Sequence, residues 1–340
     1  MEEKLPFEKI EREILVKREA ETNLDYGKKP EERTIKELLD YGVINLNKPQ
    51  GPTSHQISDY AQRILGIGQA GHSGTLDPNV TGVLPLALGK ATRIVQVLLK
   101  SGKEYVCLMH LHKEVPQSKI YKTAEEFIGK IRQTPPLKSA VKREERTREI
   151  YYLNIYEIEG KDALFKIGCE AGTYIRKICH DWGKKLGIGA HMSQLVRTKA
   201  GPFTDKDWIT LHDLKDAYEF YKEGNETPLK KIILPMERGV AHLPKVWILD
   251  TAADTLCHGA DLSTPGISKL HSSIEKNDTV AVMTLKGELV CFGTAKMASE
   301  EMAGQEKGLA VTTEKVFMEP GTYPKFVKKQ NPQGLAAKTR

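Results

Sequence analysis

The stretch Gly71-His-Ser-Gly-Thr-Leu-Asp-Pro78 is a glycine-rich loop that places one carboxylate, Asp77, directly before a proline. An aspartate in this setting is most often a turn residue or a helix cap, because its side chain hydrogen-bonds nearby backbone groups. The alternative is a carboxylate held on a tight loop so that it projects into a cleft. The small neighbours of Asp77 would then let a bulky substrate approach the backbone closely.

The segments on both sides of this loop predict regular structure. Residues 41–47 are expected to form a short strand that ends at a turn-rich loop. Thr53 and Gln56 have the spacing of a capping box, so a helix is expected from there to about Gly66. After the loop, a second helical run covers 92–99.

Further along the chain, strands are followed by an amphipathic helix. Residues 105–112 alternate in the manner of a strand, and 151–158 with 163–169 predict a hairpin. Thr173 is a candidate cap for a helix that runs to Leu186 and buries one apolar face.

Arg176 falls in the first turn of that helix, off its apolar face, where the helix dipole disfavours a cation. A surface arginine is the common explanation. The alternative is that Arg176 faces a cleft carboxylate and keeps it ionised. A carboxylate nucleophile requires this, because only the anion attacks.

The pattern changes after residue 242, where short strands and turns predict a separate, small, β-rich domain. Strands and helices do not alternate regularly as βαβ units along the chain. The expected fold class is therefore α+β with largely antiparallel pairing.

Composition excludes several classes of protein. The chain has 340 residues with 39% hydrophobic and 28% charged content, which indicates a globular protein. It has no run of about 18 apolar residues, so no membrane span is expected, and its charged N-terminus lacks the apolar core of a secretory signal. The five cysteines form no C-x-x-C pair, so reduced thiols and a cytoplasmic location are expected. A net charge of +6 permits nucleic-acid binding without demonstrating it.

Five motifs resemble those of the TruB-type pseudouridine synthases, which isomerise uridine inside folded RNA. In chain order they are 43–54, 71–85, 103–105, 172–176 and 189–198. The ordered set is far more specific than any one motif alone.

Within this family the chain is most similar to the archaeal and eukaryotic dyskerin-like branch, whose members act in H/ACA ribonucleoproteins. Residues 135–152 resemble the thumb-loop region of that branch, and 258–270 resemble the start of its PUA RNA-binding domain. The resemblance implies an extension, 1–40, that packs on the PUA domain. It further implies a catalytic domain at 41–245 whose mainly antiparallel mixed sheet is flanked by helices, and a β-barrel-like PUA domain at 246–327. The resemblance does not extend to the last residues, 330–340, and the basic composition of 328–340 predicts a disordered tail.

The resemblance also implies roles for individual residues. Asp77 would be the catalytic aspartate, and Arg176 would pair with it. Tyr105 would lie against a flipped-out uracil, and His72 would help to hold that nucleotide out of the stack. Taken singly, each has an ordinary structural explanation, and the ordered motifs are what favour the catalytic one. The pocket would be completed by Lys48 and Leu195.

RNA-binding surfaces are implied in both domains. Basic residues of the thumb-loop region would contact phosphates rather than bases; they are Lys142, Arg143, Arg146 and Arg148. The PUA-like domain would grip the guide RNA through Gly259, Pro265, Gly266 and Lys269.

The implied RNA partners are an H/ACA guide RNA and a substrate rRNA or tRNA. The implied protein partners are a small zinc-ribbon protein, a glycine- and arginine-rich-family core protein and a kink-turn-binding protein. No metal or organic cofactor is expected.

Two alternatives remain open at this point. The first is a guide-independent synthase that modifies the T-loop uridine of tRNA. The second is a non-catalytic RNA scaffold on an inherited synthase fold, which the presence of Asp77, Tyr105 and Arg176 disfavours.

Overall fold

The computed structural model describes residues 3–135 and 144–325, which divide into two compact units. The first unit comprises the described residues up to 11 and from 31 to 243. The second comprises 12–30 and the described residues from 244 onward.

The N-terminal extension is shared between the two units, which differs from the predicted packing of 1–40 as a whole on the second domain. Leu5 is fully buried and belongs to the first unit. In contrast, strand β1 (Ile14–Val16) pairs antiparallel with β14 (Ile267–His271) in the second unit. Lys17 there donates to Met302, Ala303 and Gln305 carbonyls at 2.9, 3.1 and 2.6 Å, and so satisfies the C-terminal end of helix α9 (Ser299–Gly304).

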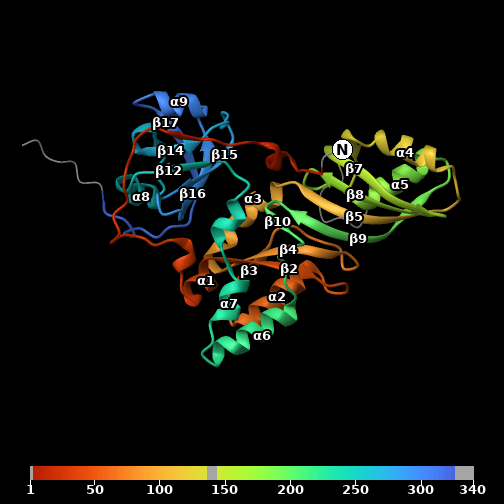
Figure 1. Cartoon of the computed structure of the whole chain (residues 1–340), viewed down its shortest axis with the longest axis horizontal. Helices are drawn as coiled ribbons and strands as arrows, with labels where there is room; N and C mark the ends of the chain where they lie inside the picture. The colour runs from red at the N-terminus through yellow and green to blue at the C-terminus, as the bar shows by residue number, and fades with distance from the viewer. Residues whose placement is uncertain (1–2, 136–143, 326–340) are drawn as a thin grey trace, which may run out of the picture. The chain divides into compact units, whose positions relative to one another are not determined.

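A ten-stranded sheet forms the framework of the first unit (Figure 1). Its main path runs β11-β2-β4-β9-β5-β8-β7-β6, with β3 paired to β4 and β10 to β9. Between these strands the described pairings are antiparallel, apart from the parallel pair β4 and β9. The predicted α+β class with a mainly antiparallel mixed sheet is confirmed. The strands are β2 (Gly42–Lys48), β3 (Ala70–His72), β4 (Thr81–Leu88), β5 (Lys103–Leu111), β6 (Gly129–Gln133), β7 (Arg146–Glu159), β8 (Asp162–Cys169), β9 (Ala190–Ala200), β10 (Phe203–Thr204) and β11 (Leu234–Pro235).

Helices cover this sheet and enclose two hydrophobic cores. In one core, Trp182 of α5 packs on Phe165 of β8, with ring centroids 5.3 Å apart. In the other, Ile57 of α2 packs among Leu46 and Leu84 of β2 and β4. The helices are α1 (Ile35–Tyr41), α2 (Ser54–Leu65), α3 (Val95–Lys100), α4 (Gln117–Glu125), α5 (Ile175–Lys185), α6 (Leu211–Lys222) and α7 (Thr227–Ile232), with 3-10 turns η1 (Pro6–Lys9), η3 (Gly89–Ile94) and η4 (Met236–Val240).

Two helix starts test the predictions from sequence. The capping box of α2 is confirmed: Thr53 accepts from the Gln56 amide, and Gly66 ends the helix in the left-handed conformation at φ 66°. The predicted cap of α5 is wrong, because the Thr173 hydroxyl donates to the Glu170 carbonyl instead. Gln133, at the end of β6, accepts from the amide of Tyr174 at 3.0 Å and donates to its carbonyl at 3.1 Å, so another strand holds the residue that precedes the helix.

Glu3, near the start of the chain, is fixed to the ten-stranded sheet by charged hydrogen bonds. Glu3 accepts from Asn154 and Tyr156 of β7 at 3.1 and 2.7 Å, and from Lys166 of β8 at 2.8 Å. Burial alone would raise the pKa of Glu3, but these hydrogen bonds outweigh it and lower the pKa to about 2. The carboxylate therefore stays ionised in the folded protein at every pH above this value.

Replacing Glu3 with glutamine is expected to lower the free energy of unfolding at pH 7 by about 1 kcal/mol, the usual worth of a partly exposed charged network. The folded-state pKa is depressed, so the contribution is complete above the unfolded pKa of about 4.3. It is lost as the pH falls from there toward 2. Urea unfolding of Glu3→Gln at pH 7 and pH 3, beside the exposed control Glu11→Gln, measures this. A loss of equal size at both pH values would contradict it.

The second unit is built on a seven-stranded sheet in the order β1-β14-β12-β15-β16-β17-β13. Val246, Val282 and Cys291 belong to its buried core. The predicted β-rich domain is confirmed, and it begins close to the predicted residue, 246. Its remaining elements are β12 (Lys245–Ile248), α8 (Asp250–Cys257), β13 (Leu262–Ser263), η5 (Thr264–Gly266), β15 (Thr279–Met283), β16 (Leu289–Ala295) and β17 (Leu309–Val316). Across the residues described in both units, no helix has the length and apolar character that crossing a membrane requires.

Candidate active site

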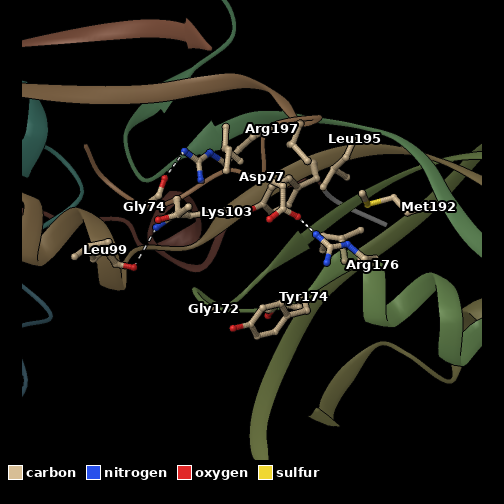
Figure 2. Close-up of a pocket in the computed structure, with 16 residues that line it drawn as sticks. Gly74, Asp77, Leu99, Lys103, Gly172, Tyr174, Arg176, Met192, Leu195 and Arg197 are labelled. Atoms are coloured by element: carbon tan, nitrogen blue, oxygen red, sulfur yellow. Dashed lines mark hydrogen bonds and ion pairs between the residues drawn. The ribbon is translucent and has the colours of Figure 1, made fainter. Parts of the chain in front are cut away.

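Asp77 and Arg176 form an ion pair, although 99 positions separate them in the sequence (Figure 2). Asp77 comes from the loop between β3 and β4, and Arg176 from the first turn of α5. Their side chains are 52% and 48% exposed, so the pair is open to solvent rather than sealed in the core. The structure thus brings together the two residues that the sequence analysis paired.

Two polar side chains hold the loop that carries Asp77 through hydrogen bonds to its backbone. Lys48, at the end of β2, is fully buried and donates to the carbonyls of Pro49, Pro78 and Val80 at 2.9, 3.1 and 2.9 Å. Ser54, at the start of α2, accepts from the amide of Leu76 at 2.8 Å and donates to its carbonyl at 3.2 Å. The backbone is therefore fixed on both sides of Asp77, which holds the carboxylate in one place.

A cleft of about 550 Å³ opens beside the ion pair. This volume lies within the roughly 300–1,000 Å³ range of small-molecule sites, so it suits a single extruded nucleotide. Tyr105 and Leu195 contribute to its wall, as predicted for the pocket, while Met192 and Val80 add apolar surface. The full lining is Gly74, Thr75, Leu76, Asp77, Val80, Leu99, Lys103, Tyr105, Gly172, Thr173, Tyr174, Ile175, Arg176, Met192, Leu195 and Arg197.

Tyr105 offers a ring and a protonated hydroxyl to the cleft. Burial raises the pKa of Tyr105, while the neighbouring Arg197 opposes that rise. The phenol therefore remains protonated near neutral pH. Its ring packs against the hydrophobic core that contains Trp182, but is only partly buried there. The exposed part of the ring can stack on a base.

Two further cations of the cleft, Lys103 and Arg197, were not singled out from the sequence. Lys103 donates to the carbonyls of Leu98 and Ser101, both at 2.7 Å. Burial, and then the charge of Arg197, lower the pKa of Lys103 to about 7. The parity of the strands was an available signal. Lys103 lies two residues before Tyr105 on β5, and Arg197 two residues after Leu195 on β9, so each shares a face with a predicted pocket residue.

Lys48 and His72 lie outside the cleft lining, which differs from their predicted places beside the nucleotide. Lys48 is turned inward by the carbonyls that it holds. His72 is drawn into the sheet by the pairing of β3 with β4, where it lies opposite Leu86. Burial first, and then Arg197 and His55, lower the pKa of His72, and its buried Nδ1 has no hydrogen-bond partner among the described residues.

The predicted RNA-contact residues of the thumb-loop region are only partly described. Lys142 and Arg143 lie outside the described residues. Arg146 and Arg148 are half-buried on the first part of β7. Arg148 pairs with Glu170 at 3.3 Å, and its guanidinium lies where a side chain on the cleft residue Gly172 would meet it, 3.2 Å from an added Cβ.

The four residues predicted to contact guide RNA all belong to the second unit. Gly259 and Pro265 are exposed, and Gly266 is half-buried. Lys269 lies on β14, with its ammonium 5.5 Å from the ring centre of Trp247. Their RNA-binding role stays a prediction.

Replacing Lys48 with methionine is expected to lower the free energy of unfolding by about 3 kcal/mol, because three carbonyls, one of them buried and two partly buried, lose their donor. The loosened loop should also slow the chemical step by roughly ten-fold, as expected when a reacting group is misplaced. Chemical denaturation and single-turnover kinetics measure the two effects. Lys122→Met, at an exposed lysine, is the control. Equal stability and equal rates of the two variants would show that Lys48 does not hold the loop of Asp77.

Family models match this chain along most of its length. The N-terminal domain of the TruB family of pseudouridylate synthases matches 62–175, and the C-terminal domain of tRNA pseudouridylate synthase B matches 176–241. A PUA domain matches 244–317, and a DKCLD domain matches 2–58.

Relatives and solved structures agree with these models. A probable tRNA pseudouridine synthase B of Methanopyrus kandleri is 54% identical over 95% of both chains, and one of Pyrococcus furiosus is 57% identical over 95% of this chain and 96% of its own. A crystal structure of a Cbf5-Nop10-Gar1 complex contains a chain with TM-score 0.91 and 57% identity, covering 95% of this chain and 98% of that one. A structure of an H/ACA RNP bound to a substrate RNA containing 2′-deoxyuridine contains a chain with TM-score 0.89 and 55% identity, covering 94% and 99%.

Proposed function

This chain belongs to the TruB family of pseudouridylate synthases, and we propose that it is the catalytic subunit of an H/ACA-type ribonucleoprotein that converts uridine to pseudouridine at positions chosen by a guide RNA. The observation that carries this proposal is the likeness, over 94% of the chain, to a subunit of an H/ACA RNP bound to substrate RNA. The cleft with its solvent-open Asp77–Arg176 pair supplies a site where such chemistry can occur.

The reaction exchanges one bond of the nucleotide for another. The bond between C1′ and N1 breaks with its electron pair on the uracil, and C1′ then bonds to C5. The hydrogen on C5 leaves as a proton while N1 gains one, so the product is an isomer of the substrate. The uridine must leave the helix for this, at a cost of a few kcal/mol.

The cleft residues divide these tasks. Asp77 acts on the ribose or base as the carboxylate nucleophile, and Arg176 pairs with it and orients it. Stacking on Tyr105 compensates part of the extrusion cost, since base–aromatic stacking contributes about 1–3 kcal/mol. Leu195 and Met192 supply apolar contact around the ring.

Sequence recognition would come from base pairing between guide and target, as in other RNA-guided systems. The PUA domain would hold the guide, and Arg146 would contact phosphates near the cleft, with Lys142, Arg143 and Arg148. We expect this chain to assemble with proteins corresponding to the Nop10 and Gar1 of the similar complex. A kink-turn-binding protein is proposed as a further partner, on the resemblance alone.

A second candidate function rests on the relatives, which are named as probable tRNA pseudouridine synthases B. In this case the chain alone would modify tRNA, without a guide. Release of tritium from C5-labelled uridine tests both functions, with the chain alone or with guide RNA and partners, on bare tRNA or a guide-matched target. The guided function predicts turnover of the matched target that depends on the guide. Turnover of bare tRNA alone, with no effect of any guide, would overturn it.

A further inference from the structure

Arg197 lines the cleft, yet its charged side chain is almost completely buried. It lies on β9 directly opposite Tyr105 of β5, and the residue is 1% exposed. The group that favours its charged form is Tyr105 rather than a carboxylate. Within residues 3–135 and 144–325 no acidic side chain forms an ion pair with it. A buried cation without a carboxylate is costly, which is why such groups concentrate at functional sites.

The guanidinium of Arg197 connects strand β4 with the loop that carries Asp77. Its Nε donates to the Val83 carbonyl of β4 at 2.7 Å. Its Nη2 donates to the Gly74 carbonyl, in the loop of Asp77, at 3.2 Å (Figure 2). Tyr105 lies directly opposite Arg197 in the pairing of β5 with β9. One planar group thus connects the loop of Asp77 with strand β4, next to the residue whose ring faces the base.

The backbone around Arg197 is shaped to bring β4 this close. Gly82 on β4 has φ 109°, and a Cβ there would lie 2.2 Å from the Arg197 carbonyl oxygen. A side chain at position 82 would therefore force the two strands apart. The close approach lets the guanidinium reach the Val83 carbonyl.

The charge of Arg197 acts on the ionisable groups around it. Its positive field contributes to lowering the pKa values of Lys48, His72 and Lys103, after burial in each case. The same field would act on negative charge that develops on the uracil when the bond between C1′ and N1 breaks. Such preorganised charge in a water-poor site commonly accounts for a large share of catalysis.

We propose that Arg197 is a positioning residue for the reaction, whose buried guanidinium fixes the loop of Asp77 against the ring of Tyr105 and keeps an unpaired positive charge behind the departing uracil. This rests on the proposed function, because the charge and the register matter only if a uridine reacts in this cleft. In this account Arg197 makes no contact with the substrate. It acts through the loop and Tyr105, which it positions, and through the field of its charge.

The test compares Arg197→Met, Arg197→Lys and the control Arg33→Met in the full ribonucleoprotein. Arg33 is also a buried arginine, but it pairs with Glu237 at 2.7 Å and lies outside the cleft lining. Single-turnover rate, RNA dissociation constant and melting temperature are measured for each. Arg197→Met should slow the chemical step by about 30-fold or more, the size expected when a reacting group is displaced, with RNA affinity within about two-fold. Arg197→Lys keeps the charge and should recover part of the rate, while Arg33→Met should lower the melting temperature with little change in rate.

A rate of Arg197→Met within about two-fold of the parent would overturn the inference. So would losses of rate in Arg197→Met and Arg33→Met that follow their melting temperatures in parallel, because that result indicates a purely structural role. If Arg197→Met does not fold, Arg197→Lys decides, and a rate equal to that of the parent overturns the inference. Failure of the parent protein to convert uridine would instead refute the proposed function itself.

Discussion

Replacing Asp77 with asparagine is expected to lower the single-turnover rate of pseudouridine formation by about 10³-fold or more, the loss typical of a removed nucleophile. Asparagine has nearly the same shape, so the loop held by Lys48 and Ser54 should keep its conformation. It cannot supply an anion, however, and only an anion attacks. RNA affinity should change little, because the lost oxygen charge contributes to chemistry rather than to phosphate contacts.

Tritium release and a filter-binding assay on the same preparation separate these effects. Asp205→Asn, at an exposed aspartate of the same unit, is the control for loss of one negative charge. Loss of RNA binding in Asp77→Asn would show that the residue is structural. A rate close to that of the parent would remove Asp77 from the mechanism and revive the scaffold alternative.

Replacing Arg176 with lysine is expected to slow the chemical step by roughly 10²-fold or more, because a flexible ammonium cannot orient the carboxylate of Asp77 as the rigid, planar guanidinium does. Arg176→Met should lose still more, since the charge is gone as well. Neither change should unfold the protein, because the Arg176 side chain is half exposed and lies off the buried face of α5. The same single-turnover assay measures the losses.

Lys177 provides a matched control, because it is the next residue of α5 and pairs with Asp181 rather than with a cleft residue. Lys177→Met should therefore leave the rate within about two-fold of the parent, as is usual for surface substitutions away from a site. Equal rates of Arg176→Lys and the parent would mean that the ion pair is incidental to the reaction.

Local signals predicted local structure well in this chain. The helix α2 follows from Thr53, Gln56 and Gly66, which all lie within its own sequence. The start of α5 could not be predicted from its own sequence, because Gln133, which holds the preceding residue Tyr174, lies 41 residues earlier in the chain. A hydrogen bond from another strand leaves no sequence signal near the helix, so the nearby Thr173 was a misleading candidate for the cap.

Side-chain directions in the site likewise could be predicted only where the sequence itself carries the signal. The ordered motifs were enough to bring Asp77 to Arg176 and to place Tyr105 and Leu195 at the cleft. They gave no direction for Lys48, whose partners are carbonyls of a loop that folds back over it. Arg197 could have been found from strand parity, yet the reason it tolerates burial, two distant carbonyls and a facing tyrosine, belongs to the tertiary structure alone.

In this mechanism Asp77 and Arg176 act together on an extruded uridine. A double-mutant cycle tests this joint action. Single-turnover rates are compared for the parent, Asp77→Asn, Arg176→Met and the double variant. If the arginine works through the carboxylate, its removal should cost almost nothing once the carboxylate is gone, so the double variant should match Asp77→Asn. A double variant whose loss equals the product of the two single losses would show that the two side chains act independently, and would contradict the account.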